Sequence, residues 1–228
     1  MKIINHGKTV VKVVARREIQ SYVNDSKLVV LCRISYITVD KGLLSAFTER
    51  WQPDTSSFHL LVGEMTITLD DVSQLLHIPV RGTFFTMPNL DRAEAVAWLH
   101  TFLGVPMPEA RQQTDKGPLC SLMWLRDEVY PRCCRDEQWD RAARAFLLHL
   151  VGSTIFANKS QSRTRVAYLD MFRDLTSVGN YAWGAMALVF MYDQLREASR
   201  AATKQLAGYA TLLQVRIFMF YIFLKFKI

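Results

Sequence analysis

Hydrophobic and polar positions follow two different periods between Phe58 and Gly82, and this stretch anchors the interpretation of the chain. Residues 58–62 are mostly apolar, and residues 65–69 alternate apolar and polar side chains, which is typical of a half-buried strand. Gly63 and Glu64 lie between them and predict a turn, because glycine adopts positive φ at little cost. The pattern therefore predicts a short β-hairpin over residues 58–69.

The period changes to that of a helix directly after this hairpin. Thr68 is expected to be the N-cap, with Asp71 three residues later completing an acidic capping box. Asp71 also favours the first helical turn because a carboxylate there meets the positive end of the helix dipole. Pro79 is expected to end the helix, and Gly82 to turn the chain after it. The buried face of this helix is predicted to consist of Val72, Leu75 and Leu76.

Further capping residues mark two helices on either side of this stretch. Asp40 is expected to cap a helix whose apolar stripe continues to Trp51 and ends before Pro53. Asp91 and Glu94 have the spacing of a second capping box, and Gly104 has the place of a helix terminator. Both helices are predicted from local signals alone.

The second half of the chain is dominated by apolar residues that recur every three or four positions. The strongest helical signal covers residues 136–151, and Asn180 is expected to cap a long apolar helix over residues 181–199. Other helices are expected at residues 122–129, 168–175 and 202–214, and surface loops at residues 105–118 and 158–165. The fold class that follows is mainly α, an α+β chain with a minor β-hairpin, arranged as a single helical domain.

The charge of the chain is concentrated at its ends. The net charge is +7 over 228 residues, but the first 17 residues carry five Lys or Arg and no acid. Residues 196–228 carry six bases against Glu197, which leaves the part between at about −3. Residues 1–29 lack a clear period and are expected to be a loosely ordered basic N-terminal extension. Nucleic-acid binding is therefore expected to be weak and due to the ends.

Motifs of known chemistry are missing from the sequence. It has no glycine-rich phosphate loop, no HExxH, and no paired-cysteine metal motif, so no cofactor and no metal ligand are assigned. His59 and Glu64 lie close in the predicted hairpin, where an acid–base pair would need a pocket. Tyr181, Trp183 and Gly184 form an aromatic cluster that could stack a base or a peptide, although core packing at a helix start is the stronger interpretation. No catalytic residue is assigned.

The residue pattern resembles one known family. It is carried above all by the block from Gly63 to Val72, GEMTITLDDV, preceded by Phe58-His59-Leu60 and followed by Tyr181-Ala182-Trp183-Gly184. Over roughly residues 30–214 this order of motifs resembles the plant mobile domain of the MAIN and MAIN-like proteins, also called aminotransferase-like. The family usually has Pro in place of Leu61 and Gly in place of His77, so this chain lacks the glycine that most easily ends the central helix.

The resemblance implies a nuclear protein, related to transposable elements, that supports transposon silencing, genome stability and meristem maintenance and associates with a phosphatase-7-like partner. It implies no catalytic residues, so the leading hypothesis is a non-enzymatic interaction domain. The alternatives are a nucleic-acid-binding module derived from a transposon and a degenerate, inactive copy. The label aminotransferase would require a Schiff-base lysine and a phosphate cup. Lys41, Lys116 and Lys159 lie in predicted turns or loops, so transamination is rejected.

The last fourteen residues, 215–228, differ from the preceding helix in composition. They are strongly apolar, and the resemblance ends at Gln214, so we expect this tail to lie outside the family domain and to come from a truncated reading frame. Its longest uncharged run, residues 217–224, is eight residues, well short of the roughly 20 that span a bilayer. No signal peptide or membrane segment is expected. The tail is predicted to extend the last helix or to lie against the core.

Overall fold

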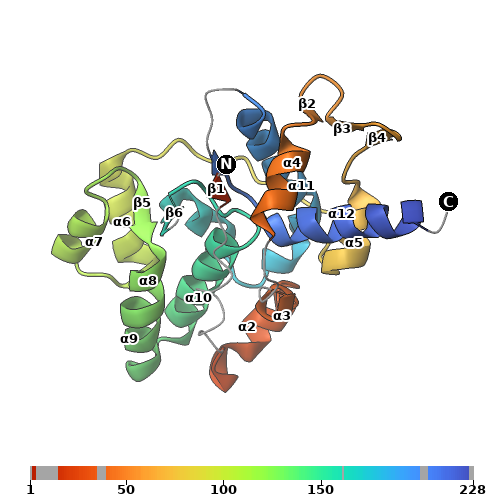
Figure 1. Ribbon diagram of the computed structural model, residues 1–228. Coiled ribbons are helices and arrows are strands. Elements are labelled where there is room, and N and C mark those ends of the chain that lie inside the picture. Colours follow the sequence, from red (N-terminus) through yellow and green to blue (C-terminus); the bar gives the residue numbers. More distant parts are fainter. Residues whose placement is uncertain (1, 4–14, 35–39, 161, 201–204, 226–228) are drawn as a thin grey trace.

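The computed structural model describes residues 2–3, 15–34, 40–160, 162–200 and 205–225 (Figure 1). The side chains described are those of residues 15–32, 40–160, 162–200 and 206–219. The helices are α2 (Gln20–Asp25), α3 (Leu31–Ile34), α4 (Lys41–Thr48), α5 (Leu69–Leu76), α6 (Arg92–Leu103), α7 (Met107–Gln113), α8 (Leu122–Trp124), α9 (Tyr130–Arg135), α10 (Trp139–Ser153), α11 (Trp183–Ala198) and α12 (Ala210–Lys225). Short 3₁₀ segments are η1 (Arg17–Ile19), η3 (Val166–Phe172) and η4 (Val178–Asn180), and η2 (Leu125–Val129) is a π-helical turn.

The strands are few and short, as the sequence predicted for a mainly helical fold. β2 (Trp51–Gln52), β3 (Ser57–Leu60) and β4 (Gly63–Met65) form an antiparallel sheet in that order. β5 (Leu119–Ser121) pairs antiparallel with β6 (Arg163–Arg165), and β1 (Lys2–Ile3) pairs parallel with β7 (Gln205–Leu206). The first sheet joins neighbouring segments of residues 51–65, whereas the other two join segments that are distant in sequence.

Two long helices organise the packing around one continuous apolar core. α10 contacts α2, α6, α9 and β6, and Figure 1 shows it beneath the β5–β6 pair on the same side of the molecule as α6 to α9. α11 contacts α5, β2 and β7, and α12 contacts α4 and α5 on the other side. The helical period read at residues 136–151 is confirmed, because α10 buries nearly every side chain from Ala142 to Ser153.

The predicted hairpin exists, but its turn lies two residues earlier than expected. Leu60 pairs with Gly63 and His59 with Glu64, so Leu61 and Val62 form the turn and Gly63 already belongs to β4 with φ of 124°. A third strand, β2, contains Trp51, which was expected on the preceding helix. α4 instead ends at Thr48, because the Trp51 ring packs against Phe58 with centroids 4.8 Å apart.

The predicted N-caps are confirmed in three helices. The Asp40 carboxylate accepts a hydrogen bond from the Leu43 N–H at the start of α4. Thr68 and Asp71 form a reciprocal capping box on α5. Asp91 and Glu94 form the second box on α6, which ends at Gly104 in the left-handed conformation. Each cap joins groups within a few residues, which explains why the sequence alone revealed them.

The end of α5 shows how the chain accommodates the missing glycine. His77 takes the C-cap place with φ of 49° and donates its N–H to the Ser73 carbonyl. A left-handed conformation costs an L-residue about 1–2 kcal/mol. The helix therefore ends at this position without a glycine, and the strain is concentrated in one exposed residue.

The N-terminal segment is more ordered than expected from residue 15 onward. Ile19, Val23 and Leu28 are fully buried, and η1 and α2 contact α10. The Tyr22 hydroxyl donates to Asp140, and the Arg16 N–H donates to the Tyr130 hydroxyl. The expectation of a loose extension over residues 1–29 is therefore corrected for residues 15–29, whereas residues 1 and 4–14 lie outside the described residues.

The central segments depart from the predicted elements in two places. The expected loop at residues 105–118 contains helix α7, which starts with Pro108 in its first turn. The helix expected to stop before Pro131 instead continues through α8, the π-helical turn η2 and α9, with Pro131 in the first turn of α9. Proline lacks a backbone donor, and the wider π turn removes the need for one at this position.

The polar loop at residues 158–165 and the following helix also differ from prediction. Arg163–Arg165 forms β6, because its backbone groups pair with the distant strand β5. The helix expected at residues 168–175 is the 3₁₀ segment η3, two residues earlier. α11 begins at Trp183 with Ala182 at the N-cap position and no side-chain cap, so the expected cap by Asn180 is wrong; Asn180 lies in η4, and its carbonyl accepts the Thr83 N–H.

The C-terminal tail continues the last helix, which is one of the two arrangements predicted for it. α12 begins at Ala210 rather than near Ala202, a residue outside the described part, and passes Gln214 without interruption. The Gln214 side-chain carbonyl accepts the Asp40 N–H at 2.6 Å, and Arg216 Nε lies 2.9 Å from the Asp71 carboxylate. Ile217 is buried. The start of the tail thus belongs to the packed body, which continues past Gln214.

Candidate functional site

The candidate residues of the hairpin separate into a buried member and an exposed pair. Phe58 is fully buried between Trp51 and Phe47. His59 Nε2 lies 3.0 Å from a Glu64 carboxylate oxygen, and both side chains are about half exposed. The Ser57 hydroxyl donates to the same carboxylate. The structure confirms that His59 and Glu64 meet, but it holds them on the exposed face of a three-stranded sheet, His59 on the central strand and Glu64 on an edge strand.

The candidate residues at the start of α11 fix the path of the chain. Trp183 is fully buried, its indole N–H donates to the Val178 carbonyl, and its ring stacks on Phe172. The Gly184 N–H donates to the Pro79 carbonyl at 2.7 Å. A Cβ on Gly184 would lie 2.9 Å from side-chain carbons of Val72 and Val80, so only glycine permits this approach of α11 to α5. This cluster supports core packing, the stronger of the two interpretations.

Tyr181 and Asp71 have intermediate positions in the same architecture. Tyr181 is half-buried, forms an edge-to-face contact with Trp183, and pairs through its backbone with Thr83. Burial raises the pKa of its hydroxyl, and the carboxylates of Asp170 and Asp174 add to the rise. Asp71 caps α5 and pairs with Arg216. The two motif blocks, far apart in sequence, therefore join one structural unit.

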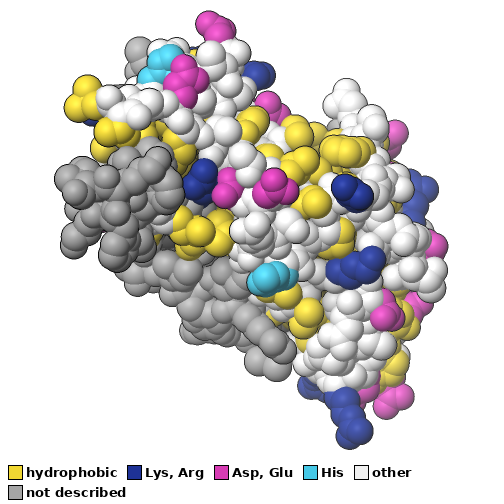
Figure 2. Space-filling view, turned by 90° about the vertical axis from the view of Figure 1, so that its right-hand side faces the viewer, with side chains coloured by type: hydrophobic (Ala, Val, Ile, Leu, Met, Phe, Trp, Pro, Cys, Tyr) yellow, Lys and Arg dark blue, Asp and Glu magenta, His cyan; other side chains and the backbone are white. Residues whose placement is uncertain are grey.

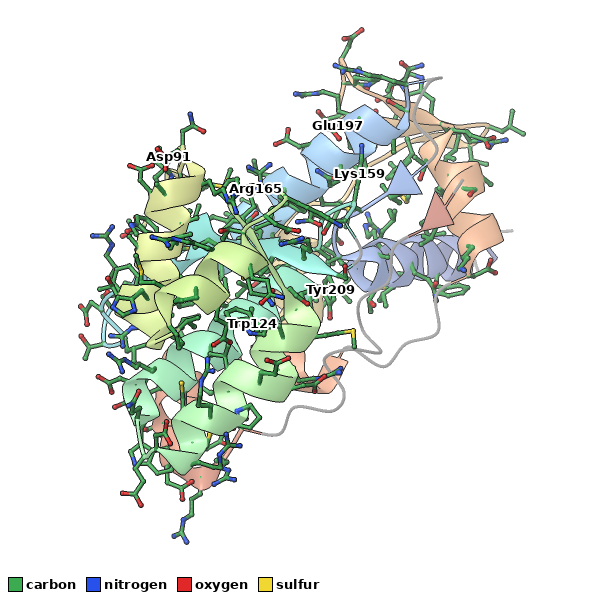
Figure 3. All side chains as sticks on the ribbon, turned by 90° about the vertical axis from the view of Figure 1, so that its left-hand side faces the viewer. Asp91, Trp124, Lys159, Arg165, Glu197 and Tyr209 are labelled. Carbon is green, nitrogen blue, oxygen red and sulfur yellow. The ribbon has the colours of Figure 1, made fainter. Side chains whose placement is uncertain are left out.

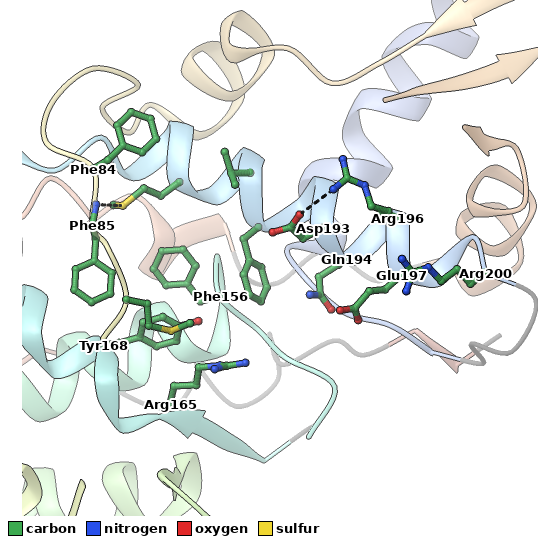
Figure 4. Close-up of a pocket in the computed structure, with 14 residues that line it drawn as sticks. Phe84, Phe85, Phe156, Arg165, Tyr168, Asp193, Gln194, Arg196, Glu197 and Arg200 are labelled. Atoms are coloured by element: carbon green, nitrogen blue, oxygen red, sulfur yellow. Dashed lines mark hydrogen bonds and ion pairs between the residues drawn. The ribbon is translucent and has the colours of Figure 1, made fainter. Parts of the chain in front are cut away.

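A groove of about 530 Å³ lies beside this unit, along the exposed face of α11 (Figure 4). Met186, Val189 and Phe190 come from the first turns of α11, and Asp193, Gln194 and Glu197 follow on the same face. Residues 84–87 form the facing wall, held by the backbone pairing of Thr83 with Tyr181 and by a hydrogen bond from the Phe85 N–H to Met186 Sδ. Sequence reasoning missed this groove, although it did predict the apolar helix.

The apolar end of the groove combines a packed floor with exposed walls. Phe156 stacks on Tyr168 with centroids 4.8 Å apart and meets Phe190 edge to face at 5.7 Å. Phe84 is 61% exposed and Val189 is 53% exposed. A rigid aromatic floor beneath exposed apolar walls is the arrangement that anchors an apolar side chain of a partner.

The other end of the groove is charged. Arg196 and Arg200 line it together with Asp193 and Glu197, and Arg165 lies between this end and the apolar end, beneath Tyr168 and Phe156 (Figure 4). Glu197 is already paired with Lys159 at 2.6 Å, and Figure 3 shows Lys159, Glu197 and Arg165 on the same face of the molecule. Burial raises the pKa of the Tyr168 hydroxyl to about 12, and the Arg165 guanidinium opposes part of this rise. Tyr168 therefore stays a neutral hydrogen-bond donor at physiological pH.

The remaining titratable groups are arranged for packing rather than for nucleophilic chemistry. Cys120 is fully buried, and burial raises the pKa of its thiol to about 12. Burial also raises the pKa of the Cys133 and Cys134 thiols. Among the described residues, no three His, Cys, Asp or Glu side chains gather as metal ligands would. In the same part of the chain, no helix has the length and apolar character needed to cross a bilayer.

The lysines considered for a Schiff base are dispersed. Lys41 begins α4, which corrects the predicted turn, and Lys116 is exposed after α7. Lys159 is engaged by Glu197 at the rim of the groove. These positions do not converge with a phosphate cup in the described residues, so the residues present do not fit pyridoxal phosphate.

Comparison with known proteins gives one family and several relatives. The plant mobile domain matches residues 28–224, which extends past Gln214. Protein MAIN-LIKE 2 of Arabidopsis thaliana is 38% identical over 187 residues, covering 81% of this chain and 27% of that protein. Protein MAINTENANCE OF MERISTEMS of the same plant is 35% identical over 184 residues, covering 79% and 37%.

A third relative carries the name of an enzyme. The serine/threonine-protein phosphatase 7 long form homolog of Arabidopsis thaliana is 30% identical over 193 residues, covering 80% of this chain and 13% of that protein. The chain thus spans about a third or less of each of these three relatives. No solved structure matches it.

Proposed function

The chain belongs to the plant mobile domain family, and from this premise we propose that it is a non-enzymatic protein-interaction domain of the nucleus. It would act in transposon silencing, genome stability and meristem maintenance by binding a protein partner. The relation to the protein named MAINTENANCE OF MERISTEMS supports the last of these roles.

The groove along α11 carries the proposal. Its apolar wall is the exposed side of Val189 and Phe84, placed over the aromatic pair Phe156 and Tyr168. Exposed apolar side chains that border a pocket are typical of protein-binding surfaces. The family motif residues support this groove from beneath, because Gly184 and Trp183 fix the start of α11.

The absence of a catalytic role is part of the proposal. The pair His59 and Glu64 supports it, since both side chains are half exposed on the face of a small sheet, where water competes with any substrate. The raised pKa of the Cys120 thiol supports it as well, because a thiol rather than a thiolate is a poor nucleophile.

A phosphatase-7-like protein is the partner we propose. The phosphatase 7 long form homolog contains a region similar to this chain. We propose that the domain in this chain and the related region of the phosphatase homolog compete for the same ligand or bind each other.

The test is a capture experiment with the whole chain as bait in plant nuclear extract, read by mass spectrometry. Val189→Asp places a charge on the groove wall, whereas Met123→Asp does the same on α8 at a nearly equal exposure of 55%. We expect a defined set of proteins to be lost with Val189→Asp and retained with Met123→Asp. Direct mixing with the purified phosphatase homolog, followed by size-exclusion chromatography, tests the named partner.

The proposal would be overturned if both variants captured the same proteins as the unmodified chain. Circular dichroism melts of both variants serve as the control for folding. An activity assay on phosphoester and amino-acid substrates completes the test, since reproducible turnover abolished by His59→Gln would contradict the non-enzymatic role.

A further inference from the structure

We propose that the groove along α11 binds a short linear peptide. In this peptide a bulky apolar side chain is followed, after a spacer of about four or five residues, by carboxylates. This inference rests on the proposed interaction function and adds the chemistry of the partner. It uses two features of the groove: the apolar end at residues 84–87 and the excess of arginine over carboxylates among the residues that line the groove.

The apolar end has room for one large side chain. Phe84 and Phe85 lie on one side of it and Phe156 on the other (Figure 4), and Met186 and Phe190 line it from α11. The rings of the floor are held by mutual contacts, so little order has to be created when a partner side chain enters. Preorganised aromatic surfaces of this kind favour aromatic or leucine anchors.

The charged end has basic groups without counter-charges. Arg196 pairs with Asp193 at 3.9 Å, and Glu197 pairs with Lys159 at 2.6 Å. Among the described residues, Arg165 and Arg200 have no ion-pair partner, and no hydrogen bond of the Tyr168 hydroxyl is found. Figure 4 shows Arg165 beneath Tyr168 and Phe156, with Arg200 further along the groove. A carboxylate beside Arg165 would meet one guanidinium group near the neutral Tyr168 hydroxyl, and a second carboxylate further along the groove would meet Arg200.

The length of the groove sets the spacing. Met186 and Arg196 are ten residues apart on α11, which corresponds to about 15 Å of helix at about 1.5 Å per residue. An extended peptide covers this distance in about four or five residues at roughly 3.3 Å each. The sequence of such a ligand therefore contains an apolar residue, a short spacer and then acidic residues.

The test uses fluorescence polarisation with the whole chain and a defined probe. The probe is a fluorescein-labelled Gly/Ser peptide of about ten residues with one Phe and, about four residues later, Asp-Asp. Three matched peptides replace Phe by Ala, Asp-Asp by Asn-Asn, or Asp-Asp by phosphoserine-Ser. We expect the first probe to bind, and each of the Ala and Asn peptides to bind roughly threefold to tenfold more weakly.

Protein variants locate the interaction. Arg165→Ala is expected to weaken binding of the Asp-Asp peptide roughly threefold to tenfold without changing the affinity for the Asn-Asn peptide. The exposed Arg135, outside the groove on α9, gives the matched control Arg135→Ala, for which no change is expected. Val189→Asp should lower the affinity for every peptide about tenfold, and Met123→Asp should lower the affinity for none.

Each other outcome overturns the inference. Equal binding of the Asp and Asn peptides would refute the acidic specificity, and preference for the phosphoserine peptide alone would replace carboxylate by phosphate as the ligand. No binding of any peptide, together with groove-dependent capture of nuclear proteins, would refute the linear motif while leaving the interaction function intact. If the chain showed neither peptide binding nor groove-dependent capture of nuclear proteins, both this inference and the proposed interaction function would be refuted.

Discussion

The contact between Asp71 and Arg216 gives the sharpest test of how the chain is held together. Asp71 accepts the Thr68 N–H at 2.7 Å and the Thr68 hydroxyl at 2.9 Å, and it pairs with Arg216 Nε at 2.9 Å. The same Nε also lies 3.3 Å from the Thr66 carbonyl. One carboxylate therefore completes the cap of α5 and anchors α12.

The magnitudes follow from burial and geometry. The two side chains are only 17% and 22% exposed, so their pairing lies between a surface pair and a buried one and contributes about 1–2 kcal/mol. Loss of a cap costs about 1 kcal/mol, which is the whole effect expected for Thr68→Ala. Asp71→Ala should therefore cost about 2–3 kcal/mol and Arg216→Ala about 1–2 kcal/mol. Asp70→Ala, an exposed neighbour in the same helical turn, should cost less than about 0.5 kcal/mol.

The assay is a double-mutant cycle measured by urea unfolding and thermal melts. We expect a coupling free energy of about 1 kcal/mol between Asp71 and Arg216. For a chain of this length each kcal/mol corresponds to about 2–4 °C, so Asp71→Ala should lower the Tm by about 5–10 °C. Additive effects of the two substitutions, within about 0.3 kcal/mol, would refute the anchoring of α12 through this carboxylate.

The other predictions address one residue or group each. His77→Gly should raise the unfolding free energy by about 0.5–1 kcal/mol in urea unfolding, because glycine removes the left-handed strain at a smaller entropic cost; a loss of stability would refute the strain. Gly184→Ala should lower it by about 1–3 kcal/mol through overpacking, whereas Gly42→Ala, whose Cβ would find only one contact at 3.4 Å, should not; equal thermal melts would refute the close approach. Duplex DNA binding should be weak, and replacing both Arg16 and Arg17 by Ala should lower its salt slope by up to about two in anisotropy titrations; an unchanged slope would count against binding by the ends.

The surface charge agrees with weak binding of nucleic acid. Figure 2 shows basic and acidic side chains interspersed on one face of the described residues, with hydrophobic ones between them. A duplex contacts many phosphates at once, and interspersed acids oppose each such contact. The described residues on the face in view form no continuous basic surface of the kind that DNA-binding domains present.

Sequence reasoning succeeded where the controlling contacts are local. The boxes at Thr68 and Asp91 join groups three residues apart, and the period at residues 136–151 follows from one face of one helix. It failed where a distant segment decides the conformation. Trp51 belongs to a strand because β3 pairs with it, and Arg163–Arg165 is a strand because β5 lies beside it.

The candidate site shows the same limit. The apolar character of α11 was evident, but the groove needs the wall at Phe84 and the guanidinium of Arg165, which lie about eighty residues apart in sequence. No local period singles out Phe84, since residues 84–87 belong to no helix or strand. The motif residues that stood out, Trp183 and Gly184, are those that the core requires.

The anchoring of α12 has a consequence for the order in which the chain acquires its structure during synthesis. Gln214 accepts the Asp40 N–H across 174 residues of sequence, so this contact cannot form until those 174 residues have been synthesised. At about 5–20 residues per second this delay is roughly 10 to 35 seconds. During that interval the apolar faces of α4 and α5 lack their covering helix. The nascent chain is thus expected to depend on chaperones at this stage, and slow translation would prolong its exposure to aggregation.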